Sequence, residues 1–244
     1  MKVLLLSGTR EAREVAAWLH AGNVPAIASF AGVTREPELP AIPTRLGGFG
    51  GREPFRAYLR SERITHILDA THPFAAAMSA RAQAVAEEEG VAYRQLLRPE
   101  WAPGAGDRWT TLAREEDASS HIPEGARVFL ATGRQTLDRF AGLAGRYLIC
   151  RQIDPPERAF PFPNGEFLVG RPPFSVADEV ALFRKLRIDW LVVKNAGGRM
   201  SATKLTAARQ LGLPVAMIAR PPQPPGERAR TVEEAVAWLN AGRG

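Results

Sequence analysis

The chain has 244 residues, of which 45% are hydrophobic and 24% are charged. This composition excludes wholesale disorder, and the length is enough for one large domain or two small ones. The net charge is +6, and 28 of the 32 basic residues are arginines, since only four lysines occur. The arginines are dispersed and form no basic run among aromatic residues, which disfavours nucleic-acid binding. A solvated arginine-rich surface is the simpler interpretation, and recognition of a polyanionic small molecule is the functional one.

The cysteine content and the hydropathy indicate a compartment. The single cysteine, Cys150, has no partner for an internal disulfide, which is typical of a reducing environment. The apolar run at residues 3–6 is too short for a signal-peptide core. No stretch approaches the roughly 20 apolar residues of a membrane helix. We therefore expect a cytoplasmic protein that binds no membrane. No spacing of His, Cys, Asp and Glu indicates a metal site.

In the first half of the chain, short apolar runs alternate with helical patterns. A linker rich in proline and glycine follows at 99–106. Strands that alternate with helices predict βαβ units and a parallel sheet. The predicted strands are 3–6, 25–30, 44–46, 64–70 and 93–97, and the helices are 11–20, one after 44–46, and 75–89.

The second half repeats this alternation. The loop glycines Gly8 and Gly133 follow matching strands and lie 125 residues apart, as do Asp69 and Lys194. We therefore predict an α/β protein with two Rossmann-like parallel-sheet domains, 1–105 and 106–244. Ligands of such folds bind at the carboxyl ends of strands, here in a cleft between the domains. The predicted strands are 127–131, 147–152, 167–169, 190–193 and 215–219, with helices at 176–186, 202–211 and 233–240 and a proline-rich loop at 220–226.

Two loops in the first half are candidates for ligand contacts. Gly8, Thr9 and Arg10 join the first strand to the first helix, where backbone N–H groups can hold an anion. The segment has one glycine, unlike the G-x-G-x-x-G pattern, and Thr9 also fits a helix N-cap. Residues 47–51 contain four glycines, which either admit a ligand close to the backbone or form a flexible turn.

Two further loops follow buried strands. Asp69, Thr71 and His72 come at the end of one, where polar side chains face a ligand site more often than elsewhere. The segment from Lys194 to Lys204 holds two of the four lysines around a Gly-Gly turn. A lysine at this position can bind a phosphate or carboxylate. A lysine whose ammonium extends from the sheet edge into solvent explains the pattern equally well. No P-loop and no G-x-S-x-G elbow occurs, which disfavours phosphoryl transfer and serine hydrolysis.

Taken in chain order, these segments resemble the precorrin-6A reductase family. The most specific motifs are Asp-Ala-Thr-His-Pro-Phe-Ala from Asp69 and Lys-Asn-x-Gly-Gly from Lys194. The chain departs from the family pattern at Ser7 (Gly in the family), at Ala196 (Ser) and at 171–174 (a Gly-Pro-Phe turn). The matching segments are 4–13, 47–51, 69–75, 98–99 with Trp101, 129–134, 194–198 with Lys204, and 217–221.

The resemblance implies a reaction and its partners. Hydride from NADPH adds to a carbon–carbon double bond of the precorrin-6A macrocycle, a proton adds to the neighbouring carbon, and precorrin-6B forms in cobalamin biosynthesis. The implied enzyme is an NADPH-dependent oxidoreductase acting on CH–CH bonds that needs no metal. Its tetrapyrrole substrate carries many carboxylates, which suits an arginine-rich site. Contact with other enzymes of the corrin pathway is also implied.

The resemblance also suggests roles for individual residues. His72 and Asp69 are the catalytic candidates, with His72 as proton donor or carboxylate partner. Thr71, Arg35, Arg98 and Arg220 are the candidates for substrate binding. The cofactor-binding candidates are Gly8, Thr9, Arg10, Gly133, Arg134, Lys194, Asn195, Gly197, Gly198 and Lys204.

Three alternatives remain open from the sequence. A cobalt-precorrin-6A reductase of the anaerobic route, NADH-linked or NADPH-linked, has the same motifs. A two-domain sugar-nucleotide transferase also places ligands at two Rossmann-like sheets. A non-catalytic nucleotide- or nucleic-acid-binding protein is suggested by the basic charge alone.

Overall fold

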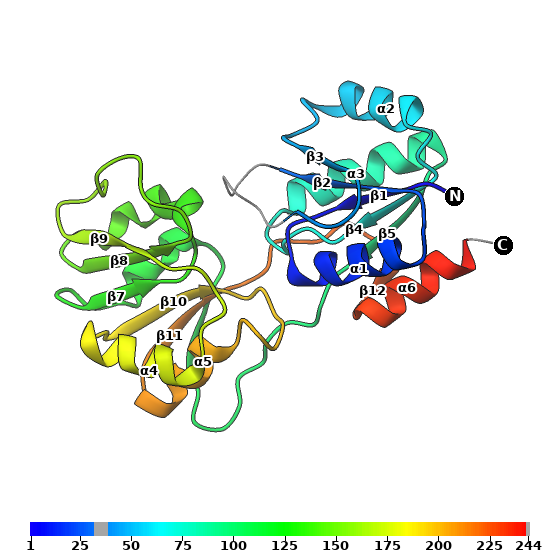
Figure 1. The fold of residues 1–244 in the computed structure, drawn as a ribbon. Coiled ribbons are helices and arrows are strands. Elements are labelled where there is room, and N and C mark those ends of the chain that lie inside the picture. The colour runs from blue at the N-terminus through cyan, green and yellow to red at the C-terminus, as the bar shows by residue number, and fades with distance from the viewer. Residues whose placement is uncertain (32–38, 243–244) are drawn as a thin grey trace. The chain divides into compact units, whose positions relative to one another are not determined.

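The computed structural model describes residues 1–31 and 39–242, which fold as two compact units (Figure 1). The first unit comprises Met1–Pro99 and Pro221–Gly244, and the second comprises Glu100–Arg220. Each unit is built on a six-stranded sheet with flanking helices. Every strand pair in the described part of the chain is parallel. The predicted α/β class with two Rossmann-like parallel sheets is confirmed.

The sheet of the first unit has the strand order β12-β5-β4-β1-β2-β3. One face buries Val3, Leu5 and Leu68 against α1 and α6, and the other buries Leu4 and Ile67 against α2 and α3. Because strand side chains alternate between faces, a strand covered on both sides is apolar throughout. The elements are β1 (Val3–Leu6), α1 (Arg10–Ala21), β2 (Ala26–Phe30), β3 (Thr44–Leu46), α2 (Arg52–Ser61), β4 (His66–Asp69), α3 (Ala76–Glu89), β5 (Ala92–Leu96), β12 (Arg228–Ala229) and α6 (Val232–Ala241).

The sheet of the second unit has the order β6-β11-β10-β7-β8-β9. Helices α4 and α5 cover one face around Phe129, Phe183 and Leu191. Two 3-10 segments, η1 and η2, pack against each other, and η2 contacts β8. The elements are β6 (Arg108–Leu112), η1 (Glu115–Ser120), β7 (Arg127–Leu130), η2 (Arg134–Leu143), β8 (Tyr147–Gln152), β9 (Gly165–Val169), α4 (Val176–Lys185), β10 (Trp190–Lys194), α5 (Thr203–Leu211) and β11 (Pro214–Ile218).

The two sheets have equivalent orders, but their outer strands are exchanged. Strand β6 follows β5 in the chain and pairs with β11, whereas β12 follows β11 and pairs with β5. If the chain is divided into the repeats β1–β6 and β7–β12, the last strand of each repeat therefore completes the sheet of the other. The 125-residue offset also holds in space, since β1 and β7 occupy the same position in their sheets, as do β4 and β10.

The division of the chain differs from the predicted domains 1–105 and 106–244. Pro221–Gly244 belongs to the first unit, because β12 pairs with β5 and Leu239 of α6 is buried in the core beside α1. The sequence pattern identifies α6 as an amphipathic helix but carries no information on which sheet it covers. Strands β6 and β12 were not predicted, since both are short outer strands without an apolar run.

Within the described residues, no helix combines the length and the apolar character required to cross a bilayer.

Candidate functional site

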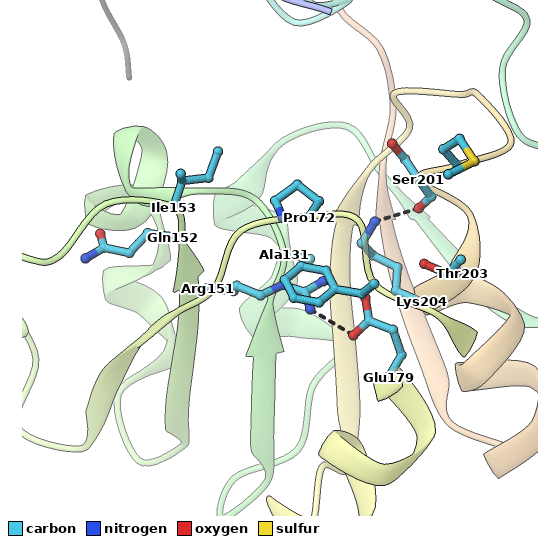
Figure 2. A pocket seen from close by; sticks show the side chains of 12 residues that line it. Ala131, Arg151, Gln152, Ile153, Pro172, Glu179, Ser201, Thr203 and Lys204 are labelled. Atoms are coloured by element: carbon cyan, nitrogen blue, oxygen red, sulfur yellow. Dashed lines mark hydrogen bonds and ion pairs between the residues drawn. The ribbon is translucent and has the colours of Figure 1, made fainter. Parts of the chain in front are cut away.

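A pocket of about 200 Å³ lies at the carboxyl ends of the strands in the second sheet (Figure 2). Ala131 follows β7, Gln152 ends β8, Phe174 precedes α4, and Lys204 lies in the first turn of α5. Open α/β sheets bind their ligands at this edge, because the loops that follow parallel strands all meet there. The pocket is therefore the first candidate for a ligand site in this unit.

A buried ion pair forms one wall of this pocket. Both terminal nitrogens of Arg151 donate to the carboxylate of Glu179 at 2.8 Å, and Glu179 is 1% exposed. The guanidinium also lies 4.3 Å from the ring centroid of Phe174 and 5.0 Å from that of Phe129. A bidentate pair of this kind satisfies both charges. Arg151 therefore shapes the pocket, and its charge is already balanced by the protein.

Lys204 provides a positive charge at the start of α5. The N-cap residue Ala202 makes no side-chain capping bond, and the N–H of Leu205 donates to the Ala202 carbonyl at 2.9 Å. The Lys204 ammonium donates to the Ser201 carbonyl at 2.6 Å and lies 5.9 Å from the ring centroid of Trp101. A helix N-terminus and a lysine both stabilise an anion. The beginning of α5 is suited to a phosphate group.

Lys194, at the end of β10, is tied to the first turn of η2. Its ammonium donates to Thr136 Oγ1 at 3.0 Å and lies 3.5 Å from the Glu115 carboxylate. Glu115 also accepts from Arg139 at 3.3 Å. Burial lowers the pKa of Lys194, and the Glu115 carboxylate opposes this shift. The structure thus places the Lys194 ammonium beside the start of η2, which follows Gly133 in the chain.

Three polar atoms near this loop are buried and have no hydrogen-bond partner among the described residues. They are Thr132 Oγ1 and both amide atoms of Gln152. Gly133, the next residue after Thr132, has a φ of 73°, which favours glycine, and a Cβ there would meet nothing within 4 Å. In Figure 2 the Gln152 side chain extends away from Arg151 and Pro172. Arg134 follows Gly133 and is exposed. Unpaired buried polar atoms are rare, and they are satisfied when a ligand binds beside them.

Asn195 orients its loop through Trp101. Its Oδ1 accepts from the Trp101 backbone N–H at 2.9 Å, and its Nδ2 donates to the Trp101 carbonyl at 3.0 Å. The Trp101 indole N–H donates to the Gly198 carbonyl at 2.9 Å. Both ends of the amide are thus engaged by the protein. Asn195 fixes the Gly197-Gly198 turn in place, a role different from the cofactor contact that the sequence suggested.

Asp69 has a similar internal role in the first unit. It is fully buried, and its Oδ1 accepts from both the N–H and the hydroxyl of Thr71, at 3.0 and 2.7 Å. Its Oδ2 accepts from the Tyr93 hydroxyl at 2.8 Å. Burial and the Asp69 charge raise the pKa of Tyr93 far above its ordinary value, so Tyr93 stays a donor. This geometry makes Asp69 a positioning residue for the loop that follows β4 and disfavours a direct catalytic role.

The loop that Asp69 positions carries Thr71 and His72. The Thr71 hydroxyl donates its hydrogen bond to Asp69, so its oxygen can only accept from a further partner. The His72 carbonyl accepts from Ala75 N at 2.7 Å, and the His72 Nδ1 accepts from Phe74 N at 3.2 Å. Both side chains are partly exposed at the carboxyl edge of the first sheet. They are the residues of this loop that can meet a substrate.

The loop after β1 packs against the same turn. Thr9 is the N-cap of α1, since its oxygen accepts from Ala12 N at 3.2 Å, and its hydroxyl also donates to the Ala70 carbonyl at 2.8 Å. A Cβ on Gly8 would lie 3.7 Å from the backbone nitrogen of His72. Arg10 forms an exposed pair with Glu14. Thr9 therefore serves the fold, and Gly8 brings the two loops close together.

The predicted substrate arginines are partly engaged by the protein. Arg98 donates to Glu11 at 2.6 Å, and both side chains are largely buried. Arg220 donates to the Asn195 carbonyl at 2.7 Å, and its side chain is 6% exposed. Arg35 lies outside the described residues. Arg98 and Arg220 thus help to hold loops at the two sheet edges.

Sequence reasoning missed several residues of these edges. Arg45 orders the glycine cluster, because its guanidinium donates to the carbonyls of Gly47 and Gly48 and lies 3.9 Å from the Phe49 ring centroid. Glu115 and the Arg151–Glu179 pair were also not predicted. Their partners are distant in the chain, so no local pattern reveals them. Only Gln152 had a usable signal, its place at the end of β8 and 19 residues after Gly133.

Comparisons with known proteins agree with this architecture. A family model described as precorrin-6x reductase CbiJ/CobK matches residues 2–240. The chain is 46% identical to a precorrin-6A reductase of Rhodococcus erythropolis, over 98% of this chain and 97% of that protein. It is 42% identical to a precorrin-6A reductase of Rhodobacter capsulatus, over 98% and 95%.

A solved structure titled CobK precorrin-6A reductase matches with a TM-score of 0.95 and 41% identity, covering 99% of this chain and 96% of that one. The match runs through both units and includes the loops described above. It does not favour a sugar-nucleotide transferase or a non-catalytic binding protein. The chain belongs to the precorrin-6x reductase CbiJ/CobK family.

Proposed function

We propose that the protein reduces precorrin-6A to precorrin-6B with NADPH, as a step of cobalamin biosynthesis. NADPH supplies a hydride, which adds to one carbon of a double bond of the macrocycle, and a proton adds to the neighbouring carbon. NADP⁺ is the second product, so the two electrons and the proton are accounted for. The names of the relatives support precorrin-6A as the substrate. The strand order and loops of the second sheet support the binding of a dinucleotide there.

The position of Lys194 is the observation that carries the cofactor assignment. Its ammonium meets Thr136 in the first turn of η2, immediately after the Gly133 turn. In dinucleotide-binding sheets, the pyrophosphate lies at the turn between the first strand and its helix. Strand β7 has that place in the second sheet. The donor set of Gly133, Lys194 and Lys204 fits phosphate groups, with Gly197 and Gly198 allowing close backbone approach.

Gln152 favours NADPH over NADH. In these folds, the residue that meets the adenosine ribose lies about 20 residues after the glycine turn, and an acidic residue there binds the 2′-hydroxyl of NADH. Gln152 lies 19 residues after Gly133 at the end of β8, and it is neutral. A neutral amide can donate to a 2′-phosphate, whereas a carboxylate repels it. The unpaired amide atoms of Gln152 agree with this assignment.

The loop after β4 is proposed to contact the macrocycle. It is held rigidly by Asp69, and it presents Thr71 and His72 at the carboxyl edge of the first sheet. The Thr71 hydroxyl already donates to Asp69, so it offers an acceptor, and the His72 imidazole is the group of this loop that can meet a substrate carboxylate. We retain Arg98 and Arg220 as contributors to substrate binding through the loops that they hold.

Anaerobic turnover of purified protein with precorrin-6A tests the proposal. We expect a corrinoid product two hydrogens heavier by mass spectrometry, with one NADPH oxidised per product, and a lower dissociation constant for NADPH than for NADH by titration. Cobalt-precorrin-6A is the comparison substrate. Faster turnover of the cobalt complex, or tighter binding of NADH, would contradict the respective part of the proposal.

A further inference from the structure

The loop after β4 is bound by a side chain from the C-terminal segment of the chain. Gln223 lies in the proline-rich loop before β12, and its Nε2 donates to the Pro73 carbonyl and to the Pro221 carbonyl, each at 2.8 Å. The Oε1 of Gln223 accepts from Gln95 Nε2 at 2.9 Å. Both the nitrogen and the oxygen of the Gln223 amide are therefore engaged by the protein, and they hold the side chain in one orientation.

Gln95 and Arg228 determine this orientation. Gln95 is 4% exposed, and its Oε1 accepts from Arg228 Nε at 3.2 Å. The two residues face each other because β12 pairs with β5. A guanidinium can only donate and a backbone carbonyl can only accept, so the two ends of this hydrogen-bond chain fix the direction of both amides between them. The donors run from Arg228 to Gln95, from Gln95 to Gln223, and from Gln223 to Pro73.

The Pro73 carbonyl is a sensitive point of the loop. Pro73 is buried and has no N–H, so its carbonyl is the group through which a hydrogen bond can hold this residue. A buried carbonyl needs a donor, and Gln223 supplies one. On the other side of His72, Asp69 accepts from the N–H and the hydroxyl of Thr71. The backbone is thus fixed both before and after His72.

Resting on the proposed reduction, we infer that Gln223 is a positioning residue for precorrin-6A, because it fixes the peptide that follows His72 in the loop after β4. Its effect is indirect, since it acts through the Pro73 backbone. Without the amide donor, the loop would have to be ordered when the substrate binds, and this ordering weakens binding. The C-terminal segment therefore contributes to substrate affinity as well as to the sheet.

Two substitutions at Gln223 separate its donor from its acceptor. Gln223→Met keeps the length of the side chain and removes both functions. Gln223→Glu keeps an acceptor for Gln95 but turns a carboxylate oxygen toward two carbonyls. We expect each variant to raise KM for precorrin-6A about fivefold or more, with kcat changed less than about threefold and the dissociation constant for NADPH unchanged. Unchanged NADPH binding also shows that the variants are folded.

Gln83→Met is the matched control. Gln83 lies in α3, and its Nε2 donates to the Pro225 carbonyl at 2.6 Å. Its loss therefore removes a contact of the same C-terminal segment without affecting the Pro73 carbonyl, and KM should stay within about twofold of the native value. A native KM in Gln223→Glu would overturn the inference. It is also overturned if Gln83→Met raises KM as much as Gln223→Met, or if kcat falls about a hundredfold in the Gln223 variants while KM is unchanged.

Hydrogen exchange tests the positioning without any turnover. The Ala75 N–H donates to the His72 carbonyl at 2.7 Å and reports on the order of the loop. We expect this amide to exchange about fivefold or more faster in Gln223→Met than in the native protein or in Gln83→Met, with the amides of β1 unchanged. Equal exchange at Ala75 in all three proteins would contradict the inference. Failure of the native protein to reduce precorrin-6A would instead contradict the proposed function, and the exchange rates would still decide whether Gln223 holds the loop.

Discussion

Tyr93 and Asp69 show how a polar residue at a strand end can serve the fold. The Tyr93 hydroxyl satisfies Asp69 Oδ2 in the interior. Tyr93→Phe would leave that oxygen without this donor, so we expect a loss of about 1–3 kcal/mol in the free energy of unfolding, measured by urea denaturation. Tyr147→Phe is the control, since the Tyr147 hydroxyl makes only a long, exposed contact at 3.4 Å. Equal stability of the two variants would mean that the Tyr93 hydroxyl contributes nothing to the fold.

A substitution at Lys194 tests the proposed cofactor site. We expect Lys194→Met to raise the dissociation constant for NADPH about tenfold or more, because a partly buried ammonium next to phosphate is lost. Fluorescence titration of NADPH measures the change. Lys185→Met removes an exposed lysine at the end of α4 and should leave the constant unchanged. Unaltered NADPH binding by Lys194→Met would exclude the phosphate site proposed beside Gly133.

At the scale of elements, Trp101 connects the segment before β6 to the turn after β10. Trp101→Phe removes the indole donor to the Gly198 carbonyl and loosens the turn that precedes Lys204. We expect NADPH to bind about threefold to tenfold more weakly, with a loss of about 1 kcal/mol in stability. Trp190→Phe, at the amino end of β10, is the matched control for titration and denaturation. A stability loss without any change in NADPH binding would mean that Trp101 stabilises the fold and does not contribute to the cofactor site.

The sequence was sufficient for elements whose pattern is local. Strand β1 is a continuous apolar run and helix α3 is an alanine-rich stretch that ends at Gly90. The loops at Asp69 and Lys194 could likewise be placed at strand ends from the apolar runs that precede them. The roles of these residues depend on distant partners. Asp69 pairs with Tyr93, 24 residues away, and Asn195 pairs with Trp101, 94 residues away. Local periodicity contains no information on such contacts, so positioning residues resembled catalytic or cofactor-binding ones.

At the scale of the whole molecule, the exchange of β6 and β12 makes each sheet depend on chain from the other half. The 125-residue repeat was visible in sequence because β1 and β7 end in similar loops. The exchange of the outer strands was not visible in the sequence. Both strands are short, and their residues do not indicate which of the two sheets they join. A boundary at a proline-rich linker is the natural prediction when the outer strands are unassigned.

Leu239 provides the test of this organisation. It is fully buried in the first unit's core, in α6, although it lies only a few residues from the end of the chain. Leu239→Ala should cost about 2–5 kcal/mol and should lower hydrogen-exchange protection in α1 and β5, with β10 and β11 unaffected. Leu191→Ala, at an equally buried site in β10, should produce the reverse distribution. Loss of protection in β11 rather than α1 after Leu239→Ala would instead place the C-terminal segment with the second half, as domains 1–105 and 106–244 require.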